Sequence, residues 1–219
     1  VSCTATVSDG SDYDTQSTDV IIDNTPPTLS SVEISPDPSY NDDTLTCIGS
    51  GSDADGDPIS YSYEWSNTST ILGTTDTLTL DSTLAHPTDT INCTVTLTDS
   101  NGGSDILSES IVISNRDPSF TGLTISPNSG VQVGTTLSCS ESVADPDGDS
   151  LTLQYTWSSN GTPLGTGSTI TITSGMVAVG DAILCSATAN DPYGGSATTT
   201  SSVILENSPP TLSVQISPN

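Results

Sequence analysis

Hydrophobic and polar residues alternate with a period of two along several segments of the chain. In the stretch 91–97 the odd-numbered residues are Ile, Cys, Val and Leu, whereas Asn and Thr stand between them. The same alternation occurs at 59–65, 78–80, 151–157, 170–172 and 183–185. A period of two is typical of β-strands with one buried face, and the branched Cβ of Thr suits the outward positions. No segment sustains a helical period, so the pattern predicts an all-β protein.

The strand pattern is itself repeated along the chain. Identical residues stand 92 positions apart at Cys47 and Cys139, Trp65 and Trp157, Cys93 and Cys185, and Asp99 and Asp191. The ends fit the same repeat, because 1–9 resembles 91–99 and Pro-Pro-Thr-Leu occurs at both 26–29 and 209–212. A fixed period of this size indicates a tandem array of one structural unit. We therefore expect the last two strands of a repeat in 1–25, complete repeats at 26–116 and 117–208, and the first strand of another in 209–219.

We interpret the sequence as a window cut from a longer array, which also accounts for the lack of a secretion leader at residue 1.

The repeat predicts how the five cysteines pair. Cys47 and Cys93 lie 46 residues apart, as do Cys139 and Cys185, so we expect one disulfide in each complete repeat. Cys3 occupies the second-cysteine position, and its partner is expected upstream of this sequence. The alternatives for Cys3 are a free reactive thiol and an intermolecular bridge. Disulfides indicate an oxidising compartment, so we expect an extracellular protein, secreted or on the cell surface.

A resemblance follows from these residues. The order Cys47, Trp65, Cys93 resembles the strand B cysteine, strand C tryptophan and strand F cysteine of immunoglobulin-like β-sandwiches, and both complete repeats carry it. This resemblance implies tandem immunoglobulin-like sandwich domains arranged as beads on a string, each with one internal disulfide beside a core Trp. Residues 1–25 would then hold strands F and G. The tyrosine usual two residues before the second cysteine is absent, since Ile91 and Ile183 stand there.

The Asp-x-Asp-Gly-Asp loops, which lead into Tyr-x-Trp strands, and the linkers at 24–27 and 207–210 resemble those of PKD and cadherin-like repeats in giant prokaryotic cell-surface proteins. The Trp-Asp-Phe-Gly-Asp-Gly string of PKD domains is missing from the chain. The resemblance implies a cell-surface repeat protein involved in adhesion.

Charge narrows the range of functions. The chain has 27 acidic residues and one Lys or Arg, for a net charge of −26. This excludes a nucleic-acid partner and docking on an anionic membrane, both of which need clustered cations. The sequence contains no nucleophile elbow, phosphate-binding glycine loop or HExxH motif, and its one histidine, His86, is expected in a loop. We therefore expect no enzymatic activity.

The acidic loops are candidate calcium sites. Asp53, Asp55 and Asp57 place three carboxylates within five residues, and such charges repel unless a cation lies between them. Oxygen ligands on a short glycine-containing loop suit Ca²⁺. In an immunoglobulin-like sandwich the B–C and F–G loops lie where strand A begins, and cadherin-like arrays stiffen their junctions there with calcium. The candidate ligands are Asp23, Asn24, Asp53, Asp55, Asp57 and Asp99 in one group, and Asn115, Asp117, Asp145, Asp147, Asp149 and Asp191 in the other. The alternative is solvated turns, since Asp and Gly favour turns.

Three sequons for N-glycosylation occur, at Asn67, Asn92 and Asn160. In a chain this rich in Ser and Thr such matches also arise by chance. Asn67 and Asn160 fall in the same predicted turn after the core Trp, which favours exposure.

These features predict a structural or adhesive segment of a large extracellular protein, such as a stalk, an adhesin shaft or a surface filament. Its partners would be neighbouring repeats, further copies in a filament, or a cell-surface ligand. One alternative is a carbohydrate- or protein-binding module, for which Tyr13, Tyr40 and Tyr193 are candidate contact residues. Another is an accessory domain of a secreted enzyme.

Overall fold

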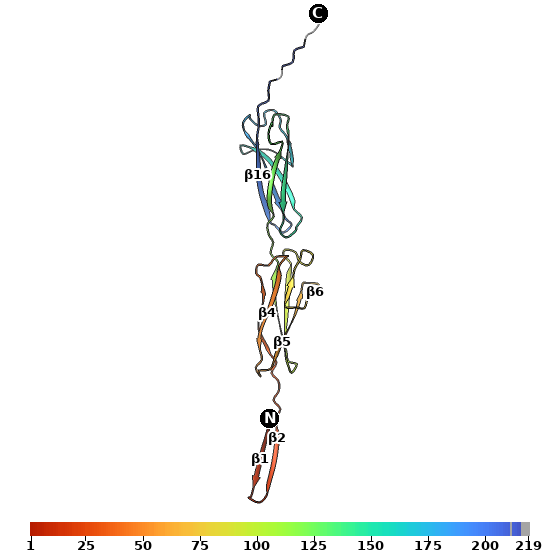
Figure 1. Ribbon diagram of the computed structural model, residues 1–219, viewed down its shortest axis with the longest axis vertical. Helices are drawn as coiled ribbons and strands as arrows, with labels where there is room; N and C mark the ends of the chain where they lie inside the picture. Colours follow the sequence, from red (N-terminus) through yellow and green to blue (C-terminus); the bar gives the residue numbers. More distant parts are fainter. Residues whose placement is uncertain (211, 216–219) are drawn as a thin grey trace. The chain divides into compact units, whose positions relative to one another are not determined.

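The computed structural model describes residues 1–210 and 212–215 (Figure 1). All the regular secondary structure of these residues consists of β-strands, which confirms the all-β prediction. Among these residues there is no helix of the length and apolarity that a membrane span requires. The chain divides into two compact units. The first comprises Val1–Ser39, Asp43–Leu80 and Asp89–Val112, and the second comprises Tyr40–Asp42, Asp81–Thr88 and the chain from Ile113 onward.

The N-terminal segment forms an antiparallel hairpin of β1 (Ser2–Ser8) and β2 (Tyr13–Asp19). Its turn is held by Asp9, whose Oδ1 accepts hydrogen bonds from the backbone N–H groups of Ser11 and Asp12, each at 2.9 Å. Cys3 is exposed and forms no disulfide within the described residues. Its pairing with an upstream cysteine stays a prediction.

The first unit contains a sandwich of two antiparallel sheets. One sheet has the order β3-β4-β7, with bounds Thr28–Ser35, Thr44–Ser52 and Thr77–Thr79. The other has the order β6-β5-β8-β9, with bounds Ile71–Gly73, Ile59–Ser66, Thr90–Asp99 and Ser104–Val112. In the lettering of immunoglobulin-like domains these sheets are A-B-E and C′-C-F-G. Along β8 every second residue is buried, as the alternation at 91–97 predicts.

The second unit contains the same sandwich, strand for strand. Its sheets have the orders β10-β11-β14 (Ser119–Ser126, Thr136–Ala144, Thr169–Thr171) and β13-β12-β15-β16 (Thr162–Thr166, Thr152–Ser159, Ala182–Asn190, Ser196–Ile204). The turn from β12 to β13 is an Asn160-Gly161 pair with φ of 48° and 77°, the left-handed conformation that a tight hairpin needs. The chain is thus a tandem of immunoglobulin-like repeats.

A disulfide joins the two sheets of each sandwich. Cys47–Cys93 links β4 to β8, and Cys139–Cys185 links β11 to β15. Beside each bridge lies a buried tryptophan, Trp65 at 0% and Trp157 at 1% exposure. Both indole N–H groups donate to backbone carbonyls, those of Thr75 and Gly167, at 2.8 Å. The predicted disulfides and the core role of both tryptophans are confirmed.

The repeat boundaries at 25/26, 116/117 and 208/209 stay predictions. Positions 209, 210 and 212–215 carry no strand. Residues 211 and 216–219, on which the rest of the predicted first strand falls, lie outside the described residues.

Candidate calcium sites at the acidic loops

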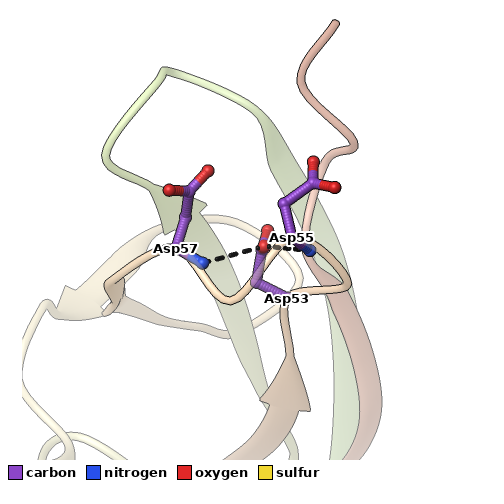
Figure 2. A group of neighbouring side chains, drawn as sticks. All are labelled: Asp53, Asp55 and Asp57. Atoms are coloured by element: carbon purple, nitrogen blue, oxygen red, sulfur yellow. Dashed lines mark hydrogen bonds between the residues drawn. The ribbon is translucent and has the colours of Figure 1, made fainter. Parts of the chain in front are cut away.

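The first acidic loop connects β4 to β5 and turns around one carboxylate (Figure 2). Asp53 Oδ1 accepts the backbone N–H groups of Asp55 at 2.8 Å and Asp57 at 3.1 Å. Gly56 makes the turn with φ of +79°, a conformation that costs glycine little. Carboxylate oxygens of the three aspartates lie within 4.8 Å of one another. Asp53 Oδ2 is buried without a hydrogen-bond partner, so this loop presents an unsatisfied oxygen.

The segment before β3 and the β8–β9 loop meet this acidic loop. Asn24 Nδ2 donates to Asp99 Oδ2 at 2.8 Å, and Thr25 N donates to Asp55 Oδ2 at 2.7 Å. Asn101 Nδ2 donates to Asn24 Oδ1 at 3.1 Å and to Asp57 Oδ2 at 2.6 Å. One open hollow of about 470 Å³ has in its lining Asp23, Asn24, Asp55, Asp57 and Asn101. The structure therefore brings together all six predicted residues of the first group.

Asp99 is held as a carboxylate by its neighbours. The Asn24 amide and the backbone N–H groups of the β8–β9 loop lower the pKa of Asp99, against the opposing effect of burial. Its Oδ1 accepts the N–H groups of Asn101 and Gly103, both at 2.8 Å. A Cβ at position 103 would lie 2.5 Å from Asp99 Oδ2 and 2.9 Å from Pro26 Cα, so only glycine allows this approach. The charge at Asp99 is thus built into the loop.

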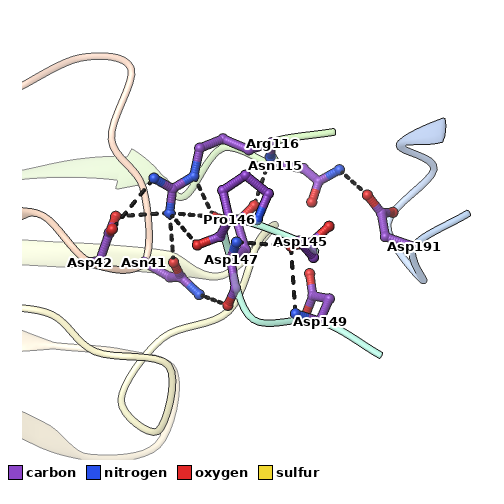
Figure 3. Close-up of polar contacts among 9 residues, drawn as sticks. All are labelled: Asn41, Asp42, Asn115, Arg116, Asp145, Pro146, Asp147, Asp149 and Asp191. Carbon is purple, nitrogen blue, oxygen red and sulfur yellow. Dashed lines mark hydrogen bonds and ion pairs between the residues drawn. The ribbon is translucent and has the colours of Figure 1, made fainter. Parts of the chain in front are cut away.

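The second acidic loop, between β11 and β12, has the same construction (Figure 3). Asp145 Oδ1 accepts the N–H of Asp147 at 2.8 Å and is 3.5 Å from that of Asp149. Oxygens of these three aspartates also lie within 4.8 Å of one another. Asn115 Nδ2 donates to Asp191 Oδ2 at 2.9 Å, the counterpart of the Asn24–Asp99 contact. All three aspartates of this loop, with Asn115 and Asp191, therefore recur at equivalent places.

Asp117 is the sixth residue of the second group, and its side chain lies close to Gly195 of the β15–β16 loop. A Cβ at Gly195 would be 2.7 Å from Asp117 Oδ1 and 2.9 Å from Asn115 Nδ2. Burial raises the pKa of Asp191, but the Asn115 amide and the N–H groups of the β15–β16 loop outweigh it and leave the pKa below its usual value.

Unsatisfied oxygens are more numerous in the second loop. Asp145 Oδ2, Asp149 Oδ2 and Asn115 Oδ1 are buried without a hydrogen-bond partner. Burial, followed by the charges of Asp145, Asp147 and Asp191, raises the pKa of Asp149. A buried acceptor without a donor costs free energy, and a cation would remove that cost.

Replacing Asp149 with Asn is expected to stabilise the second unit by about 0.5 kcal/mol in calcium-free buffer at pH 7, allowing for solvent screening. The raised pKa means that the ionised Asp149 opposes folding at neutral pH, and this cost disappears as the pH falls through the folded-state pKa. The gain should therefore vanish in acid. Thermal unfolding with a chelator, at pH 7 and at pH 3, measures both. Glu64→Gln, at an exposed position of β5, is the charge-matched control. A destabilised Asp149→Asn variant at pH 7 would contradict the prediction.

Two residues that contact these loops are absent from the sequence-based predictions. Asn101 contacts Asp57 of the first loop, and its position two residues after Asp99 could have indicated this contact. Arg116 contacts Asp147 through Nε at 2.8 Å, and no sequence pattern marks this pair.

The predicted glycosylation residues lie apart from these loops, whereas two predicted contact residues do not: Tyr193 N donates to Asp191 Oδ1 at 2.8 Å, and Tyr40 lies beside Arg116. Asn160 is exposed, Asn67 is half-buried in the β5–β6 turn, where its Oδ1 accepts the N–H of Ser69 at 2.9 Å, and Asn92 is half-buried on β8. Glycosylation of these residues stays a prediction. Tyr13 is 79% exposed on the hairpin, whereas the Tyr40 ring lies 4.7 Å from the Arg116 guanidinium.

No protein family model matches the chain, and no curated protein matches its sequence. Similar solved structures include three N-terminal domains of the bacteriophage RB49 Highly Immunogenic Outer Capsid protein, with a TM-score of 0.34 and 18% identity, covering 82% of this chain and 70% of that one. Fibronectin(III)-like modules of Clostridium thermocellum CbhA give 0.31 and 11%, covering 80% and 94%. A 1.5-MDa bacterial ice-binding adhesin gives 0.36 and 18%, covering 85% and 67%. The immunoglobulin-like fold rests on the strand order and disulfides described above.

Proposed function

We propose that this chain is a structural or adhesive segment of a large extracellular repeat protein, and that calcium binds at the acidic loop of each complete repeat. The observation that carries the proposal is the duplicated site. Aspartate and asparagine side chains from three separate segments converge in both repeats, and both groups contain buried oxygens without hydrogen-bond partners.

The architecture suits a mechanical role outside the cell. Tandem repeats build length by adding one unit after another, and each sandwich is cross-linked between its sheets by a disulfide. Disulfides persist in oxidising surroundings, which supports a secreted or cell-surface location. The net charge of −26 keeps such an array soluble and discourages non-specific association.

Calcium fits the donors that the sites contain. Ca²⁺ takes six to eight oxygen ligands from carboxylates, amide carbonyls and water. In the first repeat Asp53, Asp55, Asp57 and Asp99 supply carboxylates, while Asp23 and Asn24 come from the segment before β3. The ion would neutralise the crowded charges and tie that segment to the two loops. We expect this link between the segment and the two loops to stiffen the repeat array under load.

Calorimetric titration of the 219-residue chain with CaCl₂ tests the proposal. We expect one ion at each acidic loop, with dissociation constants of about 10⁻⁴–10⁻³ M, as in extracellular modules. Asp53→Asn should abolish binding at the first loop and Asp145→Asn at the second, since each carboxylate organises its own loop. Glu64→Gln should leave both intact. Absence of binding heat at millimolar Ca²⁺ would overturn the calcium proposal.

A further inference from the structure

Arg116 is the one Lys or Arg in the sequence, and it lies in the second unit against the acidic loop (Figure 3). Its Nε donates to Asp147 Oδ1 at 2.8 Å, and its backbone N–H donates to Asp147 Oδ2 at 2.7 Å. The far end of the guanidinium donates to Asp42 Oδ1 at 2.8 Å, Asn41 Oδ1 at 3.2 Å and the Pro146 carbonyl at 3.1 Å. The side chain therefore holds two carboxylates and two further oxygens.

Of the two carboxylates that Arg116 contacts, Asp147 depends more on the arginine, because its side chain is buried. The Asp147 side chain is 0% exposed, whereas that of Asp42 is 62% exposed. A carboxylate taken out of water needs a compensating charge and filled acceptor positions, and Arg116 supplies both. Asn41, 2% exposed, completes the arrangement by donating from Nδ2 to the Asp147 carbonyl oxygen at 2.7 Å.

The first acidic loop has no such cation. Thr25 is the structural counterpart of Arg116, because the backbone N–H of Thr25 donates to Asp55 as that of Arg116 donates to Asp147. Asp55 is exposed, and the Thr25 backbone N–H reaches it at 2.7 Å, which reproduces the backbone contact of Arg116 without its charge. The sequence contains no further Lys or Arg that could neutralise this loop.

We propose that Arg116 is a resident cation of the second acidic loop, which fixes Asp147 without a metal and lowers that loop's affinity for calcium. The first loop depends on calcium for its positive charge and is the tighter of the two sites. The ordering of Asp147 by Arg116 stands on the contacts above, whereas the difference in affinity rests on the proposed calcium function. The two loops thus share a backbone design but differ in how they are neutralised.

The test exchanges the two equivalent residues and follows amide hydrogen exchange in the whole chain, with chelator and with CaCl₂. In the parent protein with chelator, the amides of 145–149 should exchange slowly and those of 53–57 fast. Arg116→Thr should accelerate exchange at 145–149 by at least about tenfold in chelator, and calcium should restore protection. Arg116→Lys keeps the charge but loses the forked donors. Its exchange rate at 145–149 in chelator should lie between those of the parent and Arg116→Thr.

Calorimetry on the same variants separates the two parts of the proposal. Arg116→Thr should tighten calcium binding at the second loop by about tenfold, the effect of removing one unit charge near the ion. Thr25→Arg should weaken the first site by a similar factor. Unchanged protection at 145–149 in Arg116→Thr with chelator would overturn the resident-cation role. Lost protection with no calcium binding at either loop would sustain that role and overturn the calcium function.

Exchange in the strands shows whether the variant has merely unfolded. Amides of β12 and β15 belong to the sandwich and should keep their protection in Arg116→Thr, because the substitution is confined to the loop end. Loss of protection there would mean that Arg116 supports the whole sandwich, and this would contradict a role limited to the acidic loop.

Discussion

Replacing both Cys139 and Cys185 with alanine is expected to lower the free energy of unfolding of the second repeat by about 4 kcal/mol. The bridge spans 46 residues and joins β11 to β15, so its loss returns a long loop to the unfolded chain. For a sandwich of this size the loss shifts the thermal midpoint by on the order of 20 °C. Scanning calorimetry of the whole chain measures it, because the transition of the other repeat serves as an internal reference.

The chain provides matched comparisons for this experiment. Cys47–Cys93 spans the same 46 residues, so its removal should destabilise the first repeat by a similar amount. Cys3 is exposed and forms no disulfide within the described residues, so Cys3→Ala should leave both transitions within about 0.5 kcal/mol of the parent. A Cys139/Cys185 double variant that unfolds within 1 kcal/mol of the parent would contradict the loop-entropy argument.

The fold could be predicted because its signals lie within single strands and recur at a fixed spacing. In β8 the alternation alone identifies the buried face, since burial follows every second residue from Ile91 to Asp99. In β2 the alternation identifies no buried face, because all seven residues are exposed and most of them are polar. The hairpin was predicted from the similarity of 1–9 to 91–99, so the repeat supplied what the local pattern lacked.

The site was predicted in part, for a different reason. The carboxylates of each loop are neighbours in sequence, and the fold family indicates which loops meet. The pairing of Arg116 with Asp147 and Asn41 depends instead on side chains that are 31 and 75 residues apart. No periodicity encodes such a contact, and the other copy does not repeat it, because Thr25 is the structural counterpart of Arg116 there. The difference between the two loops therefore emerged only from the structure.

Trp157→Ala is expected to destabilise the second repeat by about 3–5 kcal/mol, the range for removing a large buried aromatic side chain. Trp157 is 1% exposed within a core of Cys139, Cys185, Leu137 and Ile183, and it lies opposite Cys185 in the β12–β15 register. Aromatic residues make up only 4% of the chain, so few other side chains can fill the cavity. Calorimetry and denaturant unfolding give the free energy.

Trp157→Phe is the graded control. It keeps a ring in the core but removes the indole donor to the Gly167 carbonyl, so we expect a loss of about 1–3 kcal/mol, from the lost hydrogen bond and the reduced volume. Trp65→Ala should act on the first repeat as Trp157→Ala acts on the second, because the two residues have the same burial and the same hydrogen bond. A loss below 1 kcal/mol for Trp157→Ala would show that the sandwich collapses around the missing ring.

Because Trp157 and Cys185 face one another across neighbouring strands, their contributions should not add. A Trp157→Ala variant that also lacks the disulfide is expected to lose less than the sum of the separate losses. The sum, about 7–9 kcal/mol, approaches the whole stability of a domain. Full additivity in the triple variant would mean that the bridge acts on the unfolded chain alone and leaves the packing of the tryptophan unaffected.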